Sequence, residues 1–274
     1  MSGVTQTPAG PAEAATAVNV YREDAVAKIE INRPDRMNTW SMEVSAGLSD
    51  ALREARADDG IRAVLLTGTG RAFCSGADLK ANAEQAQAGE LDTDSALRSY
   101  NLIITTIRDM PKPVITAVNG AAAGAGASLA LAGDIVVAAE SAYFLFAFTK
   151  IGLVPDAGAS LFVPARVGFA RAAQLALLAD RVPALQAAEW GLINFAWPDD
   201  EFAAKADEMA AKLAAGPTRA YAGAKRQLNT WMYGALASQL QLEMEIQRQL
   251  AKSPDFIEGV TAFNEKRQAK FTGL

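Results

Sequence analysis

Two glycine-bearing loops hold the residues whose types and spacing best suit chemistry. The first occupies residues 71–80 and the second residues 119–128, each after an expected strand. Small residues let the backbone approach a ligand closely, and a helix that begins near Ala125 presents free N–H groups at its positive end. Two such N–H groups converging on one oxygen form an oxyanion hole for a thioester carbonyl. The alternative is structural, with both loops acting as tight turns whose small residues allow close helix packing.

The sequence contains no histidine and a single cysteine, Cys74. This composition excludes a histidine general base, a histidine-based triad and histidine-ligated metal sites. One cysteine cannot form an internal disulfide, which fits a reducing, cytoplasmic compartment. Without a histidine to activate it, Cys74 is best interpreted as a buried structural thiol. Acid–base work is therefore left to carboxylates, lysines, tyrosines, water or the backbone.

The elements that position these loops alternate between strand and helix patterns, which predicts an α/β fold with buried parallel strands. Residues 25–31 alternate with period two, and Ser41 is a candidate cap for a helix. The further expected strands are residues 63–67, 114–118 and 135–139, and the further expected helices run through residues 97–107, 128–132, 202–215, 218–229 and 236–252.

The expected organisation is a flexible tail at residues 1–17, a core at 18–198 and a helical subdomain at 199–274 for oligomerisation and coenzyme A contacts. No apolar run is expected to approach the ~20 residues of a spanning helix, so no membrane partner is predicted. The formal net charge of −5 gives no support for a nucleic-acid partner.

Several motifs, taken in order, resemble the enoyl-CoA hydratase/isomerase (crotonase) superfamily over nearly the whole chain. They are Asn32-Arg33-Pro34, the two loops, and residues 151–158, 188–193 and 261–267. Residues 150–158 and Glu189-Trp190-Gly191 are similar to the phenylacetate-pathway isomerase branch. The resemblance implies a spiral of ββα units with a C-terminal α-helical subdomain. It also implies an acyl-CoA substrate, no cofactor beyond the coenzyme A of that substrate, and a homotrimer or hexamer.

The resemblance assigns the N–H groups of Ala77 and Ala125 to the thioester oxygen. The remaining substrate-binding positions that it implies are contacts to coenzyme A or the path of its chain: Asp35, Arg36, Met37, Lys80, Phe263 and Lys266. In the family the C-terminal contacts often come from a neighbouring subunit. For each charged residue, the alternative is an ordinary solvated side chain.

The catalytic carboxylates depart from the hydratase pattern. Hydratases of the family use two glutamates, and the matching positions here, which lie beside the acyl group, are Ser128 and Phe148. Read locally, Asp156 between a proline and a glycine is a turn or a helix cap. The resemblance to single-acid isomerases instead makes Asp156 the acid–base group. We expect Phe144, Phe146 and Phe148 to form an apolar wall that raises its pKa.

The leading hypothesis is therefore a double-bond isomerase acting on an acyl-CoA. A second hypothesis uses Asp156 as a nucleophile, as in aryl-CoA dehalogenases, although those enzymes have a histidine that this sequence lacks. A third is an enoyl-CoA hydratase of atypical mechanism, and a fourth is a non-catalytic acyl-CoA binder.

Overall fold

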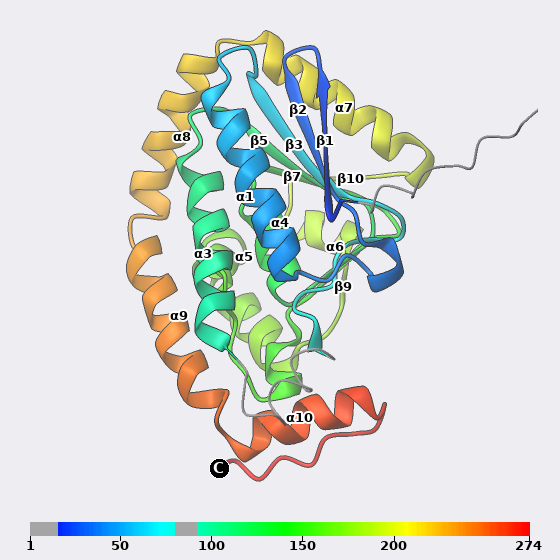
Figure 1. Ribbon diagram of the computed structural model, residues 1–274, viewed down its shortest axis with the longest axis vertical. Helices are drawn as coiled ribbons and strands as arrows, with labels where there is room; N and C mark the ends of the chain where they lie inside the picture. Colours follow the sequence, from blue (N-terminus) through cyan, green and yellow to red (C-terminus); the bar gives the residue numbers. More distant parts are fainter. Residues whose placement is uncertain (1–15, 80–91) are drawn as a thin grey trace, which may run out of the picture.

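The protein, described from a computed structural model over residues 16–79 and 92–274, contains two β-sheets flanked by helices (Figure 1). The first sheet has the strand order β1-β2-β3-β5-β7-β10, and the second has the order β4-β6-β8-β9. The strands are β1 (Val18–Glu23), β2 (Val26–Ile31), β3 (Ala63–Gly68), β4 (Ala72–Cys74), β5 (Val114–Val118), β6 (Ala121–Ala123), β7 (Ile135–Ala139), β8 (Tyr143–Leu145), β9 (Val182–Pro183) and β10 (Phe195–Trp197).

α-Helices lie between several of these strands in the described chain and make up its C-terminal part. The α-helices are α1 (Met42–Ala57), α3 (Thr93–Asp109), α4 (Ala125–Leu131), α5 (Ala159–Leu178), α6 (Ala184–Glu189), α7 (Asp199–Ala215), α8 (Thr218–Met232), α9 (Leu236–Leu250) and α10 (Pro254–Asn264). Two 3-10 helices, η1 (Pro34–Arg36) and η2 (Ala147–Ile151), complete the description. Helices α8, α9 and α10 follow one another along one side and the lower end of the molecule in Figure 1.

The central strands of the first sheet are buried because their sequences are apolar on both faces. All residues of β3 and β5 are buried, and the two strands pair in parallel. The predicted α/β class is confirmed, and the period-two segment forms β2. Strand β1 was not predicted, since most of its VNVYRE sequence is exposed at the sheet edge. The expected cap of α1 is confirmed, because the Ser41 hydroxyl accepts a hydrogen bond from the Val44 amide.

Helix α7 lies directly on the first sheet and contacts β2, β3, β5 and β7. Its buried residues recur every four positions and belong to the main hydrophobic cluster: Phe202, Ala206, Ala210 and Ala214. The first helix of the predicted C-terminal subdomain therefore contributes to the core that the sheet forms. Helices α8 to α10 extend beyond it, and α9 and α10 reach the elements that surround the cavity described below.

Helix α5 has the length and apolar composition of a membrane-spanning helix, a feature that the sequence interpretation overlooked. It is not a continuous rod, because Gly168 adopts φ 75° and ψ 170° and breaks the helical backbone, and Pro164 lies one turn earlier. Its exposed apolar side chains include Phe169 and Leu177. This helix therefore presents two short apolar pieces rather than one straight span.

A buried group of charges ties α8 to the core. The Asp134 carboxylate forms ion pairs with Lys225 at 2.7 Å and with Arg108 at 3.1 Å, and both cations are buried. Arg108 also donates to the carbonyl oxygens of Ala132 and Gly133, just after α4. The Asp134 carboxylate is thus paired with one cation from α3 and one from α8.

We expect Asp134→Asn to lower the free energy of unfolding by about 3–5 kcal/mol, because it leaves two buried cations without their carboxylate. Urea denaturation followed by tryptophan fluorescence measures this change. The control is Asp50→Asn, which breaks an exposed pair with Arg53 and should have little effect. Equal effects of the two substitutions would contradict the role given to Asp134.

Candidate active site

Each glycine-bearing loop contains a short strand of the second sheet, β4 in the first and β6 in the second. The residues that follow these strands leave the sheet at the same edge, because β4 and β6 pair in parallel. A Cβ added at Gly76 would lie 2.7 Å from the Ala123 carbonyl oxygen and 3.5 Å from the Ala125 amide nitrogen. A Cβ added at Gly126 would overlap the Cys74 carbonyl. These glycines therefore allow the first and second loops to touch through their backbones.

The first loop is held by backbone hydrogen bonds from two preceding segments. The Trp40 amide donates to the Gly76 carbonyl at 2.8 Å, and the Ser75 amide donates to the Met37 carbonyl at 3.1 Å. The Tyr100 hydroxyl of α3 donates to the Trp40 carbonyl at 3.2 Å. The conformation of the first loop is thus fixed from both sides.

Ala77 and Ala125 line the same cavity, which has a volume of about 770 Å³. Ala125 is the first residue of α4, so its N–H has no acceptor within the helix. Within residues 16–79 and 92–274, neither amide donates to another group of the chain. Both are therefore free to donate to a ligand oxygen.

Asp156 lines this cavity together with Ala77 and Ala125. It lies in the turn before α5, where Ala157 and Gly158 adopt positive φ values of 52° and 85°. Its side chain is buried, and its Oδ2 accepts a hydrogen bond from Gln247 Nε2 at 3.0 Å. Its Oδ1 has no hydrogen-bond partner within the described chain. One carboxyl oxygen is thus fixed and the other is unpaired.

The surroundings of Asp156 raise its pKa to about 8. The largest cause is burial, which disfavours the charged form, and the nearby Glu243 carboxylate adds to the increase. The hydrogen bond from Gln247 opposes both effects by stabilising the carboxylate. A group with this pKa can both accept and return a proton near neutral pH.

Glu243 and Gln247 on α9 are site residues that the sequence analysis missed. Glu243 accepts from the amides of Gly158 at 2.9 Å and Ser160 at 3.1 Å, and Gln247 also donates to the Val154 carbonyl at 3.0 Å. Both side chains are almost completely buried. The available signal was two polar residues one turn apart on the apolar face of α9, beside the buried Leu240 and Met244.

The expected aromatic wall is only partly correct. Phe148 lines the cavity, whereas Phe144 and Phe146 do not. Tyr143 and Leu145 face the cavity instead, because successive residues of β8 point to opposite faces of the sheet. Phe144 is therefore in the core, and the expectation ignored this strand alternation.

The C-terminal segment of the same chain covers part of the cavity. Phe263 of α10 lines it, together with Gln268 and Phe271 from the residues that follow. Helix α10 packs on η2, where a Cβ at Gly259 would lie 2.6 Å from the Ile151 Cα atom. Lys266 is exposed and is not among the residues that line the cavity. Phe263 therefore lines the cavity of its own chain, whereas in the family such C-terminal contacts often come from a neighbouring subunit.

The other predicted binding residues lie outside the cavity lining. Asp35 and Arg36 form η1 and Met37 caps it, so only the Met37 carbonyl reaches toward the first loop. Ser128 is buried within α4, with its hydroxyl 3.5 Å from the Gly124 carbonyl oxygen. Lys80 lies outside the described residues.

Cys74 is buried at the end of β4, in agreement with its interpretation as a structural thiol. Burial raises the pKa of its thiol to about 12, which keeps it protonated at neutral pH.

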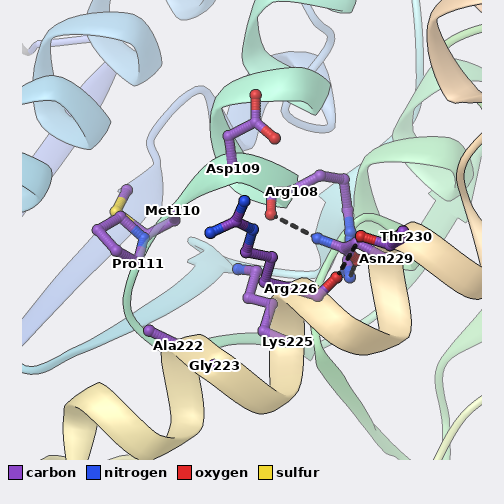
Figure 2. A pocket seen from close by; sticks show the side chains of 10 residues that line it. All are labelled: Arg108, Asp109, Met110, Pro111, Ala222, Gly223, Lys225, Arg226, Asn229 and Thr230. Atoms are coloured by element: carbon purple, nitrogen blue, oxygen red, sulfur yellow. Dashed lines mark hydrogen bonds between the residues drawn. The ribbon is translucent and has the colours of Figure 1, made fainter.

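A second hollow lies between the end of α3 and helix α8 (Figure 2). Arg108 and Asn229 bond to each other there, since the Asn229 amide donates to the Arg108 carbonyl at 2.8 Å. The neighbouring Lys225 donates to the Ile107 carbonyl and pairs with Asp134. These contacts join the end of α3 to α8, so we interpret this hollow as a structural junction between the two helices.

Comparison with known proteins agrees with this arrangement of sheets, loops and cavity. The family model "Enoyl-CoA hydratase/isomerase" matches residues 21–273. The chain belongs to the enoyl-CoA hydratase/isomerase family.

Among individual relatives, the 1,2-epoxyphenylacetyl-CoA isomerase of Escherichia coli (strain K12) is 44% identical over 92% of this chain and 96% of its own length. A probable enoyl-CoA hydratase of Rhodobacter capsulatus is 46% identical over 91% of this chain and 95% of its own length. A crystal structure of an enoyl-CoA hydratase from Mycobacterium avium subsp. paratuberculosis K-10 superposes with a TM-score of 0.86 and 42% identity. That superposition covers 93% of this chain and 98% of the other. The expected crotonase fold is confirmed.

The raised pKa of Asp156 predicts a pH-dependent stability. Between about pH 4 and 8 the folded protein retains a proton that the unfolded chain has lost, so stability decreases as pH rises. We expect Asp156→Asn to gain stability over the wild type by about 1.4 kcal/mol per pH unit in this window, with no further gain above it. Denaturant titrations at several pH values measure the difference. A difference that does not vary with pH would contradict the assigned environment.

Proposed function

We propose that this protein is an enoyl-CoA isomerase-type enzyme that moves a double bond within an acyl-CoA. The observation that carries this proposal is that Asp156, Ala77 and Ala125 line one cavity, and that the amides of the two alanines donate to no other group of the described chain. Among the described residues that line it, Asp156 is the sole carboxylic acid. A proton shuttle needs one such group, whereas hydration in this family uses two.

In the proposed mechanism the thioester oxygen accepts hydrogen bonds from the amides of Ala77 and Ala125. The ionised Asp156 takes a proton from C2 of a 3-enoyl-CoA, and the electrons of the C–H bond move onto that oxygen to give a dienolate. The two amides stabilise the developing charge. Asp156 then returns the same proton to C4, and the double bond finishes between C2 and C3. No water and no external oxidant enters the balance.

The proposed substrate matches the lining of the cavity. Phe148, Ile151 and Leu153 supply apolar surface for the acyl group. Lys150 and Arg181 also line the cavity and are exposed, which suits the phosphates of coenzyme A. The name of the Escherichia coli relative, an epoxyphenylacetyl-CoA isomerase, supports an acyl group that bears a ring.

We expect Asp156→Asn to reduce isomerisation of 3-enoyl-CoA esters by about 100- to 10,000-fold, because the amide cannot carry the proton. Turnover is followed on a panel of aliphatic and ring-bearing esters, and binding of a saturated acyl-CoA is measured by calorimetry. Binding should be largely retained. The control is Asp59→Asn, which changes an exposed carboxyl outside the cavity lining and should leave turnover intact.

The hydratase and binder hypotheses each have their own outcome in this experiment, and so does a mechanism that does not use Asp156. Unchanged turnover in Asp156→Asn would remove this residue from the mechanism. Hydration of 2-enoyl-CoA esters without isomerisation would favour a hydratase. Binding of acyl-CoA with no turnover of any ester by the wild type would favour a non-catalytic binder.

We also propose that the chain assembles as a homotrimer or hexamer. Large apolar side chains are exposed on α8 and α5, notably Leu228, Trp231 and Phe169. Trp231 and Leu228 border a hollow that also contains Ala165 and Arg166 of α5, so the two helices contribute to one surface. Exposed apolar surface of this kind is typical of subunit contacts.

We expect Trp231→Glu to reduce the mass measured by light scattering, because a charge would be buried in the proposed contact. The control is Leu102→Glu on α3, where the leucine is exposed and lies outside this surface. A wild-type protein that is monomeric at micromolar concentration would contradict the proposed assembly.

A further inference from the structure

Two polar side chains of α9 are buried next to the proposed acid–base group. Glu243 is 3% exposed and Gln247 is 1% exposed, and they are one helical turn apart on the same face. Buried polar groups of this kind lower stability unless they are hydrogen-bonded. Their hydrogen bonds all go to residues 154–160, the segment that carries Asp156.

Gln247 fixes one oxygen of the Asp156 carboxyl. Its side-chain amide donates to Asp156 Oδ2 and to the Val154 carbonyl oxygen, both at 3.0 Å. The two bonds use both hydrogens of that amide, so its orientation is determined. Asp156 Oδ1 is left without a partner in the described chain. It is the oxygen available to a substrate proton.

Glu243 fixes the turn on which Asp156 is mounted. Its carboxylate accepts from the Gly158 amide, the Ser160 amide and the Ser160 hydroxyl. The turn includes Ala157 in the left-handed region, a conformation that costs energy for a residue with a side chain. Three hydrogen bonds to one carboxylate offset that strain and hold the start of α5.

We propose that α9 acts as a two-point clamp, in which Gln247 orients the Asp156 carboxyl and Glu243 holds the turn beneath it. The clamp itself is inferred from these hydrogen bonds, and only its effect on turnover rests on the proposed function. Gln247 and Glu243 are positioning residues, since they act through Asp156.

The clamp has a distinctive electrostatic signature because its two members act on Asp156 in opposite directions. The hydrogen bond from Gln247 lowers the pKa of Asp156, whereas the charge of Glu243 raises it. From α3, the Tyr100 phenol has a raised pKa, caused first by its burial and then by the charge of the nearby Asp156. The cations on the same cavity are Lys150, Arg181 and Arg267. None of these groups is altered when α9 is changed, so the two substitutions isolate the clamp.

The test compares Gln247→Met and Glu243→Gln by infrared difference spectroscopy. The carboxylic acid band of Asp156 is assigned by its loss in Asp156→Asn, and its midpoint is titrated with pH. We expect the midpoint to rise by about one unit in Gln247→Met and to fall by about one unit in Glu243→Gln. In the isomerase assay, the pH profile of kcat should shift with the band, and Gln247→Met should lose about 10- to 100-fold in kcat.

The same helix supplies matched controls. Gln241 donates to Glu245 at 3.0 Å on the exposed face of α9, so Gln241→Met and Glu245→Gln repeat the two chemical changes away from Asp156. Neither should move the band. Should Glu243→Gln not fold, Gln247→Glu keeps the side-chain shape but adds an acid, and the midpoint should rise further than in Gln247→Met.

Shifts of both variants in one direction, or no shift in either, would overturn the clamp. The band is measured without substrate, so the clamp and the proposed function fail separately. Opposite shifts in a protein that turns over no enoyl-CoA would keep the clamp and reject the isomerase.

Discussion

The site depends on one constraint, which is the burial of a carboxyl group with only half of its hydrogen-bonding capacity used. Asp156 loses water on entering the cavity wall, and its Oδ1 receives no replacement from the described chain. Such a group is costly to keep ionised, so its pKa rises to about 8. The surrounding structure, from the strained turn to α9, holds this carboxyl in place despite that cost.

The fold brings distant segments to this carboxyl by a simple route. Both loops leave one edge of the second sheet because β4 and β6 pair in parallel, and α10 lines the same cavity from the far end of the chain. Helix α9, which precedes α10 at the lower end of the molecule in Figure 1, bonds to residues 154–160 beside the cavity. Local sequence specifies the buried strands and the positions of the glycines, whereas the cavity forms only when these segments meet in the folded chain. The site is thus a product of topology as much as of residue type.

This division explains what the sequence could and could not predict. The buried strands β2, β3, β5 and β7 were predictable, because apolar runs are local signals, and the order of the motifs pointed to the two loops and to Asp156 through the family resemblance. The exposed β1 and the short strands of the second sheet were not predicted, because they carry no such apolar run. Gln247 was not, since a glutamine within an amphipathic helix carries no mark of the residue it will contact 91 positions away. The prediction of an aromatic wall was wrong for Phe144 and Phe146 for a different reason. The composition suggested the wall, whereas strand alternation determines which side chains face the cavity.

The burial of Cys74 has a consequence for self-inactivation. Conjugated thioesters are electrophiles that alkylate thiolates, and the sequence contains no thiol other than this one. It is buried at the end of β4, and its pKa of about 12 keeps it in the unreactive thiol form. Because Cys74 does not line the cavity, the acyl group of the proposed substrate would meet no sulfur nucleophile there, and the protein would be protected from alkylation at cysteine.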